Sequence, residues 1–316
     1  MITRTDVEQA AARIAPYVRQ TPVVETGPGA FGVETSLLLK LEQLQHTGVF
    51  KPRGAFNRLL ATPMPAAGVI AASGGNHAVA VAYAAGQLGA TAELFVPASS
   101  PRHKAEQVIA LGAAVTVVNG FYAEAHDACT ARQRETGALM VHAYDMPDVV
   151  AGQGTVGLEL LVQAPGLDTV LVAVGGGGLV GGVATALGDE VAVVGVEPTG
   201  CPTWNSAQEA GEPVDVEVGG VAADSLGARR MGSIGFAACT ARDVGSVLVS
   251  DDDVVRAREL LWRDARVVAE PGGATALAAL TNGAYTPRPG ERVAVLVCGA
   301  NTDPASLRAG SSGIAS

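Results

Sequence analysis

Short apolar runs recur along the whole chain, and stretches of helical length separate most of them. Each run is continuous rather than alternating with polar residues, a pattern typical of strands that are buried on both faces of a parallel sheet. The predicted strands are Leu37–Leu41, Val69–Ala72, Ala92–Val96, Val115–Val118, Val170–Val174, Val191–Val196 and Arg292–Val297.

The segments between these runs carry signals for the starts of helices. Thr5–Glu8 and Ser250–Asp253 have the spacing of capping boxes, and Pro52 and Pro101 suit the first position of a helix. The alternation of strands and helices predicts an α/β protein with mostly parallel sheets flanked by helices. A length of 316 residues allows about two domains. The longest stretch without periodicity, Pro198–Gly235, is an expected functional loop.

Composition excludes several classes of protein. The 21 Lys and Arg residues against 31 Asp and Glu give a net charge of −10, with no basic run, so we expect no nucleic acid partner. The four cysteines are far apart and predict neither a zinc site nor a disulfide framework, which fits a reducing compartment. They are Cys129, Cys201, Cys239 and Cys298. No secretory signal opens the chain, so a cytoplasmic location is expected.

The uncharged stretch Val170–Leu187 has the length of a membrane span, but six of its residues are glycine. Lipid offers no hydrogen bonds to a glycine turn, so we expect a strand, a turn and a buried helix, and no membrane partner. The run Gly175, Gly176, Gly177 and Gly178 falls at the turn. Without Cβ atoms, its N–H groups can converge on an anion at a helix N-terminus, which predicts a phosphate site.

A dinucleotide could also supply this phosphate. Gly176-x-Gly178-x-x-Gly181 satisfies the dinucleotide fingerprint, and Glu197 closes the next predicted strand about 20 residues later. An NAD-dependent oxidoreductase, with Glu197 on a ribose hydroxyl, is therefore an alternative of a different class.

The segment Lys40–Ala55 reads K-L-E-Q-L-Q-H-T-G-V-F-K-P-R-G-A. It resembles the lysine motif K-x-E-x-x-Q-x-T-G-S-F-K-x-R-G-A of the fold-type II pyridoxal-phosphate enzymes, the group of tryptophan synthase β and threonine dehydratase. The chain departs from the motif at Val49, where serine is usual. The resemblance implies that Lys51 forms the Schiff base with pyridoxal 5'-phosphate, with Phe50 beside it. Between Phe50 and Pro52, partial desolvation would lower the pKa of the lysine and favour its nucleophilic form.

Two further segments resemble the same family. Ala72–Ala78 reads A-S-G-G-N-H-A and is similar to the S-x-G-N-H segment of serine and threonine dehydratases. The hydroxyl of Ser73 and the N–H groups at the helix start, with Gly74 and Gly75 in the loop, suit a substrate carboxylate. The amide of Asn76 suits the phenolic oxygen of the cofactor. His77 belongs to this substrate-binding segment but has no defined role.

The third segment, Val297–Asn301, is similar to the family's S-G-G-N or C-G-G-N sequence. The resemblance places Cys298 against the pyridine nitrogen of the cofactor. A neutral thiol cannot hold the ring as a pyridinium, which favours β-elimination over transamination. The stretches His142–Asp145, Ala151–Thr155 and Glu270–Gly273 support the serine/threonine dehydratase branch.

By this resemblance the fold is tryptophan synthase β-like. Residues 1–49 and 146–316 form a large cofactor-binding domain, and residues 50–145 form a small inserted domain. The implied activity is deamination of L-threonine or L-serine to a 2-oxo acid and ammonia, by a homodimer. A β-replacement enzyme similar to cysteine synthase and a serine racemase are alternatives on the same site. Racemases resembling this chain carry a serine hydroxyl at the position of Gly74, so we expect elimination to exceed racemisation.

Two more residue patterns bear on ligands. If Arg229 or Arg230 entered the pocket, its guanidinium would suit a second carboxylate, and 3-hydroxyaspartate would be the better substrate. Some serine racemase and dehydratase relatives bind a divalent cation through a Glu, a backbone carbonyl and an Asp. Glu197 and Cys201 match the first two positions, but Thr203 stands in place of the Asp. No metal is therefore assigned.

Overall fold

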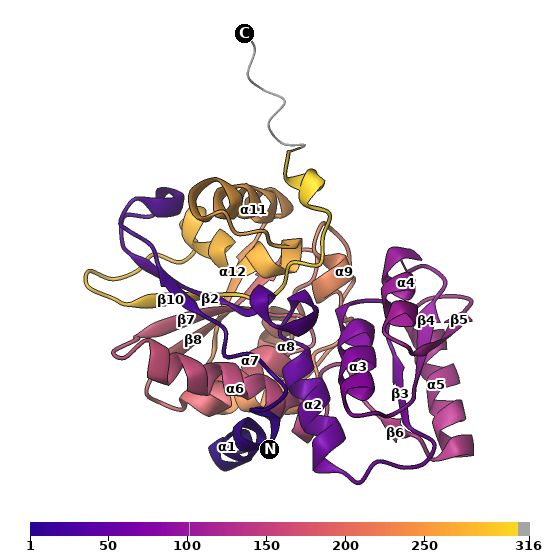
Figure 1. Cartoon of the computed structure of the whole chain (residues 1–316). Coiled ribbons are helices and arrows are strands. Elements are labelled where there is room, and N and C mark those ends of the chain that lie inside the picture. The colour runs from indigo at the N-terminus through magenta and orange to yellow at the C-terminus, as the bar shows by residue number, and fades with distance from the viewer. Residues whose placement is uncertain (101, 309–316) are drawn as a thin grey trace.

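The computed structural model describes residues 1–100 and 102–308, which form two β-sheets surrounded by helices (Figure 1). The larger sheet has the strand order β1-β2-β10-β7-β8-β9, and the smaller has the order β5-β4-β3-β6. Every neighbouring pair is parallel except β1 and β2. The strands are β1 (Val23–Glu25), β2 (Leu37–Leu41), β3 (Val69–Ala72), β4 (Ala92–Pro97), β5 (Ala114–Val118), β6 (Leu139–Met140), β7 (Thr169–Ala173), β8 (Ala192–Pro198), β9 (Gly245–Val249) and β10 (Val293–Val297). The predicted α/β class with mostly parallel sheets is confirmed.

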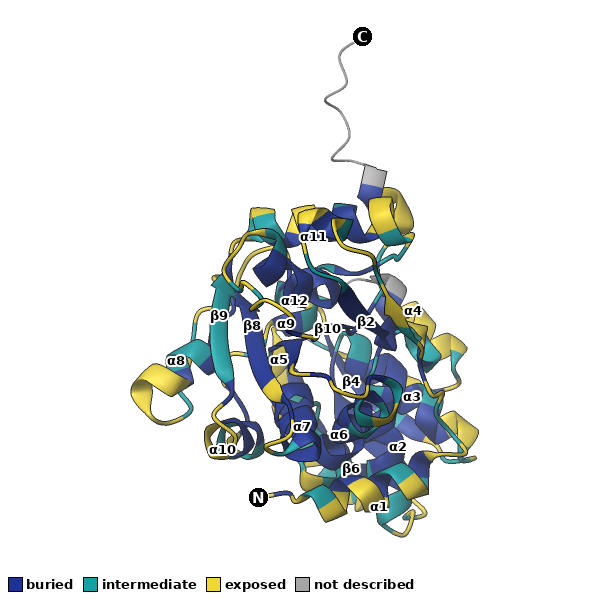
Figure 2. Cartoon of the chain, turned by 90° about the vertical axis from the view of Figure 1, so that its left-hand side faces the viewer, coloured by how far each residue is buried: buried dark blue, intermediate teal, exposed yellow. Residues whose placement is uncertain are grey.

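Helices cover both faces of the larger sheet. In Figure 2 the strands β2, β8 and β10 are mostly dark blue, buried between α6 and α7 on one side and α11 and α12 on the other, whereas the edge strand β9 is teal. The helices are α1 (Arg4–Ile14), α2 (Pro52–Ala61), α3 (Asn76–Gln87), α4 (Arg102–Ala110), α5 (Tyr122–Thr136), α6 (Pro147–Gln163), α7 (Gly178–Leu187), α8 (Thr203–Ala210), α9 (Ala223–Leu226), α10 (Ser233–Ala241), α11 (Asp251–Ala265) and α12 (Pro271–Thr281). This layering buries the apolar runs that the sequence analysis identified as strands.

All seven predicted strands are present, and their ends lie within two residues of the predicted ends. The capping box at Ser250 and the helix start at Pro52 are also confirmed. The capping box predicted at Thr5–Glu8 is wrong, because Thr3 and Asp6 form the box and Thr5 lies inside α1. Pro101 lies outside the described residues. The stretch 198–235 is not a single loop, since α8, α9 and the start of α10 lie in it.

The uncharged stretch Val170–Leu187 forms most of β7, the glycine turn and all of α7, as predicted. Close packing of α7 on α6 explains its small residues: a Cβ at Gly182 would lie 2.4 Å from the carbonyl oxygen of Val150. The glycine turn is thereby held against the rest of the large sheet. Among the described residues, no helix has both the length and the apolar character needed to cross a membrane.

The loops at the carboxyl ends of the strands of both sheets converge on one place. The loop after β7 contains Gly175–Gly177, and the loop after β10 contains Cys298. The loop after β3 leads into α3, which begins at Asn76. Ligands of open parallel sheets bind at this edge. The proposed domain boundaries at residues 50 and 146 stay a prediction.

Candidate active site

A cavity of about 540 Å³, a volume that includes space open to solvent, lies between the loops of the two sheets. Its lining includes every residue that the sequence analysis assigned to the cofactor, namely Phe50, Lys51, Asn76, Gly175, Gly176, Gly177, Gly178 and Cys298. The structure therefore brings together segments that are far apart in the sequence. Ser73, Gly74, Gly75 and His77 do not line the cavity, although they flank Asn76 in the sequence.

Lys51 precedes α2 and directs its amine into the cavity. Nζ donates a hydrogen bond to the carbonyl oxygen of Ala143 at 3.0 Å and lies 5.1 Å from the centre of the Phe50 ring. Burial lowers the pKa of Lys51 to about 8, and the nearby Glu270 only partly opposes this effect. A sizeable fraction of the amine is therefore uncharged near neutral pH, as a nucleophile or a base requires.

The glycine run forms the N-terminus of α7. Gly177 has φ +84°, a conformation that side chains other than glycine rarely adopt. A Cβ at Gly176 would lie 2.2 Å from Cγ of Tyr144, so Tyr144 packs directly on the loop. Within the described part of the chain, the N–H groups of Gly176, Gly177 and Gly178 have no protein acceptor. Unsatisfied N–H groups at a helix N-terminus suit a phosphate.

Asn76 is the first residue of α3 and is held by two side chains from the other sheet. Its Nδ2 donates to Glu270 at 2.7 Å, and its Oδ1 accepts from Nδ2 of Asn301 at 2.9 Å. These contacts fix the orientation of the amide and leave the second N–H of Nδ2 available to the cavity. Burial raises the pKa of Glu270 to about 7, although Lys104 and the Asn76 hydrogen bond oppose it.

Cys298 follows β10 and closes another side of the cavity. The side chain is buried, and Sγ lies 3.4 Å from the carbonyl oxygen of Gly272. Burial raises the pKa of the thiol to about 12, so it is neutral at physiological pH. This is the protonation state that the sequence analysis required for a residue opposite a pyridine nitrogen.

In the loop before α3, protein atoms already occupy positions that a ligand would need. Ser73 Oγ accepts from the N–H of Gly75 at 3.1 Å. A Cβ at Gly74 would lie only 1.6 Å from Oγ of Ser100, so Ser100 fills the space of a side chain at position 74. His77 is buried, and its Nε2 contacts the carbonyl oxygen of Val141 at 2.9 Å. Its place is structural, since it ties α3 to the end of β6.

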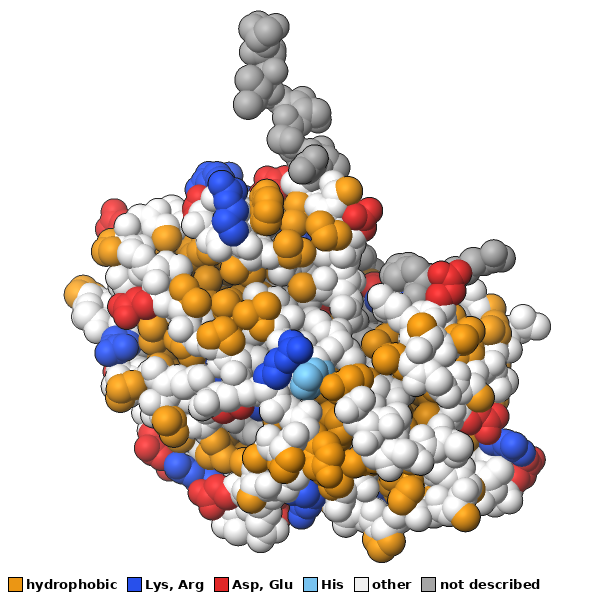
Figure 3. Space-filling model, viewed as in Figure 1, with side chains coloured by type: hydrophobic (Ala, Val, Ile, Leu, Met, Phe, Trp, Pro, Cys, Tyr) orange, Lys and Arg blue, Asp and Glu red, His pale blue; other side chains and the backbone are white. Residues whose placement is uncertain are grey.

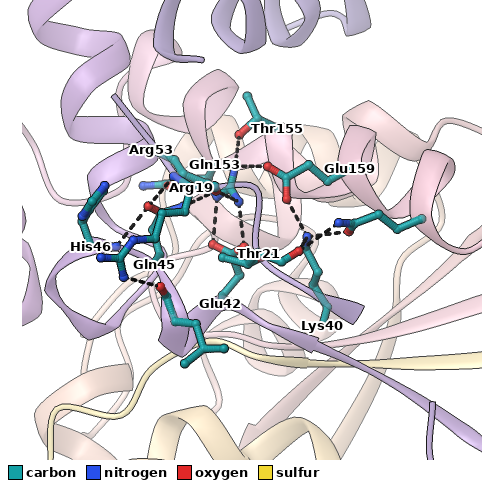
Figure 4. Close-up of polar contacts among 12 residues, drawn as sticks. Arg19, Thr21, Lys40, Glu42, Gln45, His46, Arg53, Gln153, Thr155 and Glu159 are labelled. Atoms are coloured by element: carbon teal, nitrogen blue, oxygen red, sulfur yellow. Dashed lines mark hydrogen bonds and ion pairs between the residues drawn. The ribbon is translucent and has the colours of Figure 1, made fainter. Parts of the chain in front are cut away.

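A network of charges joins Lys40 and Arg53 to Glu42 and Glu159 (Figure 4). Arg53 makes two 2.8 Å contacts with the carboxylate of Glu42 and one of 2.7 Å with Glu159. Lys40 contacts Glu159 at 2.5 Å, the side chain of Gln163 at 2.7 Å and the carbonyl oxygen of Thr21 at 2.8 Å. Lys40 and Arg53 are therefore fully engaged with protein acceptors, unlike Lys51, the third cation of the motif.

The remaining cations named in the sequence analysis do not enter the cavity. Arg229 and Arg230 are exposed, and Arg230 pairs with Asp215 at 2.7 Å. The proposed second carboxylate site at these residues is therefore not formed. On the face drawn in Figure 3, the described basic side chains are interspersed with acidic ones and form no continuous patch.

Comparisons with known proteins agree with this geometry. The model of the family described as pyridoxal-phosphate dependent enzyme matches residues 14–299. The chain is 36% identical to the L-threonine ammonia-lyase of Geobacter sulfurreducens, over 96% of this chain and 76% of that protein. It is 39% identical to the phenylserine dehydratase of Ralstonia pickettii, over 94% and 92%. The structure of maize serine racemase has 32% identity and a TM-score of 0.91, covering 97% and 95%.

The chain belongs to the pyridoxal-phosphate dependent enzyme family. The predicted fold-type II architecture, the dehydratase branch and the pyridoxal 5'-phosphate cofactor are thereby confirmed. The residues present also fit the cofactor: a poorly solvated lysine amine, glycine N–H groups without protein acceptors and an oriented amide share one cavity. They would hold the aldehyde carbon, the phosphate and the phenolic oxygen, respectively.

The nicotinamide alternative is not supported. Glu197, which that alternative placed on a ribose hydroxyl, is buried and does not line the cavity. Its carboxylate accepts hydrogen bonds from the N–H groups of Trp204 at 2.7 Å and Asn205 at 2.9 Å, at the start of α8. Burial raises its pKa to about 7.

Several cavity residues were not predicted from the sequence. Ser225 lies in the short helix α9, which no sequence signal predicts. Tyr144 stands in the recognised stretch His142–Asp145, but the sequence gives it no role in the cavity. Glu270 stands in the recognised stretch Glu270–Gly273, but its role depends on contact with Asn76 across the cavity. The role of Asp145 is likewise not visible in the sequence. Its carboxylate accepts hydrogen bonds from the N–H groups of Ser233 and Ile234 and thereby fixes the Tyr144 loop on α10.

Proposed function

We propose that the chain is an ammonia-lyase that converts L-threonine or L-serine into a 2-oxo acid and ammonia by β-elimination. The relatives named above include an L-threonine ammonia-lyase and a dehydratase of another β-hydroxy amino acid, each aligned over most of both chains. The observation that carries the proposal is the amine of Lys51, which is buried in the cavity with one carbonyl as its hydrogen-bond acceptor.

Pyridoxal phosphate, when bound, withdraws electrons from the Cα of an amino acid joined to it. The chain supplies the base. The amine of Lys51 removes the proton from Cα, and its lowered pKa matches this task near neutral pH. Because Lys51 alone among the three lysines lines the cavity, neither of the other two can replace it.

The surroundings of the cavity favour elimination. The neutral thiol of Cys298 cannot stabilise a positive charge on the pyridine nitrogen as a carboxylate would, which disfavours transamination. Asn76, oriented by Glu270 and Asn301, would donate to the phenolic oxygen. The N–H groups at the start of α3 would receive the substrate carboxylate through the Ser73–Gly75 loop.

Racemisation would need a second proton donor, on the face of Cα opposite Lys51. Gly74 offers no side chain for it, and Ser100 fills the space beside Gly74. We therefore propose that elimination exceeds racemisation. Threonine and serine are preferred over 3-hydroxyaspartate, since Arg229 and Arg230 are exposed.

We further propose a homodimer in the cytoplasm. The support is the family resemblance and the cysteines, all four of which are free and buried, as thiols in a reducing compartment can remain.

Steady-state assays of the purified holoenzyme test the reaction. L-threonine, L-serine and 3-hydroxyaspartate are supplied separately, and ammonia and 2-oxo acid are measured, with D-serine measured in the serine reaction. We expect equal amounts of ammonia and 2-oxo acid from threonine or serine. Formation of D-serine as fast as pyruvate, or turnover only when a thiol is added, would refute the proposal.

A further inference from the structure

The hydroxyl of Thr203 joins the phosphate-binding glycine loop to a buried carboxylate. Thr203 is fully buried, and its Oγ1 lies 2.5 Å from the carbonyl oxygen of Gly175 and 2.9 Å from Oε1 of Glu197. Gly175 opens the glycine loop after β7, whereas Glu197 lies near the end of the neighbouring strand β8. The contact therefore crosses between two adjacent strand ends at the wall of the cavity.

The carboxyl group of Glu197 accepts hydrogen bonds from the start of α8. The residue before this helix is Pro202, whose side chain cannot accept a hydrogen bond, so the helix start has no cap of its own. Glu197 replaces the cap by accepting from the N–H groups of Trp204 and Asn205. Both oxygens of Glu197 are thereby satisfied within the protein, as a buried carboxyl requires. The single proton of the Thr203 hydroxyl is donated to the carbonyl oxygen of Gly175. The carboxyl of Glu197, whose pKa is raised to about 7 by burial, completes the chain when it is protonated and donates to Oγ1 of Thr203.

This set of groups suits hydrogen bonds rather than a divalent cation. Mg²⁺ and Ca²⁺ take six or more oxygen ligands, with carboxylates as the charged members. Here N–H donors point at the carboxylate of Glu197, and the hydroxyl of Thr203 stands where an Asp would complete the ligand set. The described residues contain no group of three or more acidic, His or Cys side chains able to hold a metal ion.

We propose that Thr203 is a positioning residue that couples Gly175 to Glu197 by hydrogen bonds and so fixes the glycine loop for the cofactor phosphate without a divalent cation. The carbonyl of Gly175 is directed toward Thr203, which sets the direction of the following N–H groups. The inference depends on the family's cofactor but not on the reaction proposed above, because it concerns retention of the cofactor.

The first test measures the dissociation constant of pyridoxal phosphate for variants of Thr203. Thr203→Val keeps the shape and removes the hydroxyl, and should weaken cofactor binding by about tenfold or more. Thr203→Ser restores the hydroxyl and should bind within about twofold of the unmodified protein. The matched control is Thr185→Val in α7, since Thr185 is also buried and donates to a carbonyl, that of Gly181, away from the loop. Unchanged affinity in Thr203→Val, or equal losses in both valine variants, would overturn the proposal.

The second test begins with the unmodified holoenzyme, so its first part does not depend on the folding of a variant. Extended dialysis against a chelator, followed by addition of Mg²⁺ or Ca²⁺, should leave the dissociation constant of the cofactor unchanged within about twofold. Thr203→Asp places a second carboxylate beside Glu197, and its cofactor affinity should become dependent on added cation. Loss of cofactor from the unmodified protein on chelation, restored by cation, would contradict the proposal even if the enzyme is an ammonia-lyase.

Discussion

Lys40 and Lys51 belong to the same sequence motif, yet the structure places them in opposite environments. Lys40 is completely buried and has three acceptors, including the carboxylate of Glu159. Lys51 faces a cavity and has a single carbonyl acceptor. Burial lowers the pKa of both amines, but Glu159 and Glu42 oppose this effect at Lys40.

Lys40 and Lys51 show how a buried charge with a structural role differs from a buried amine that can react. A buried charge whose partners are complete is costly to disturb and has no capacity left for a ligand. A buried amine with few partners is destabilised in its charged form and is available for reaction. The third lysine, Lys104, is also buried, but its partner is the carboxylate of Asp224 on α9, which balances its charge. A role in chemistry is therefore expected for Lys51 alone.

The largest expected effect follows from Lys51→Ala. Loss of the only lysine in the cavity should lower ammonia release by about 1,000-fold or more, because it removes both the attachment and the base. Folding should be retained, since the amine has a single protein acceptor. Thermal unfolding and an ammonia assay on the same preparation check both statements, and activity within tenfold of the unmodified enzyme would rule out the assignment.

The complementary change is Lys40→Met. It leaves the half-buried Glu159 with Arg53 as its remaining cation, and we expect a loss of about 3 kcal/mol in the free energy of unfolding. The cofactor should still attach to Lys51. Urea unfolding gives the stability, and a variant as stable as the unmodified protein would show that the network in Figure 4 is not needed for folding.

A third prediction concerns pH and His77. Burial lowers the pKa of His77 to about 3 in the folded protein, whereas an unfolded histidine titrates near 6.5. The unfolded state therefore binds more protons between these values, and stability falls as the pH drops below 6.5. At pH 5 this histidine should contribute a loss of about 2 kcal/mol relative to neutral pH. In His77→Asn that part of the pH dependence should vanish from urea unfolding curves, and an unchanged slope would disprove it.

The smallest expected effect is at Gly74. A serine there could in principle supply the opposite-face hydroxyl, but its Cβ would meet Ser100. Gly74→Ser alone should therefore lower turnover by about tenfold through displacement of the loop. The pair Gly74→Ser with Ser100→Gly should recover turnover and increase deuterium exchange at Cα. Full activity of the single variant would mean that the loop moves freely.

The continuous apolar runs were sufficient to predict the central strands, because burial on both faces leaves a clear pattern. The missed strands are different: β1 and β6 are very short, and β9 lies at the sheet edge with most of its residues half-buried. The start of α1 was placed too late because Thr3 and Thr5 both suit the N-cap position, and it is Thr3 that forms the capping box, with Asp6.

The residues that line the cavity were predictable where one segment carries the motif, as at Lys51, the glycine run and Cys298, whereas their roles stay predictions. It was not predictable where the role arises from contact between distant segments. The carboxyl of Glu270 acquires its place from Asn76, which is 194 residues away, and Ser100 is adjacent to Gly74 only in the folded chain. No local pattern contains this information.

The attachment of the cofactor to Lys51 is tested most directly by reducing the holoenzyme with borohydride, digesting it and locating the modified peptide by mass spectrometry. The chain has three lysines, so the assignment is unambiguous. We expect to find the cofactor on Lys51 alone, and we expect the absorbance of the lysine-bound cofactor to be lost on reduction. Attachment to Lys40 or Lys104, or a protein that holds the cofactor without any modified lysine, would contradict it.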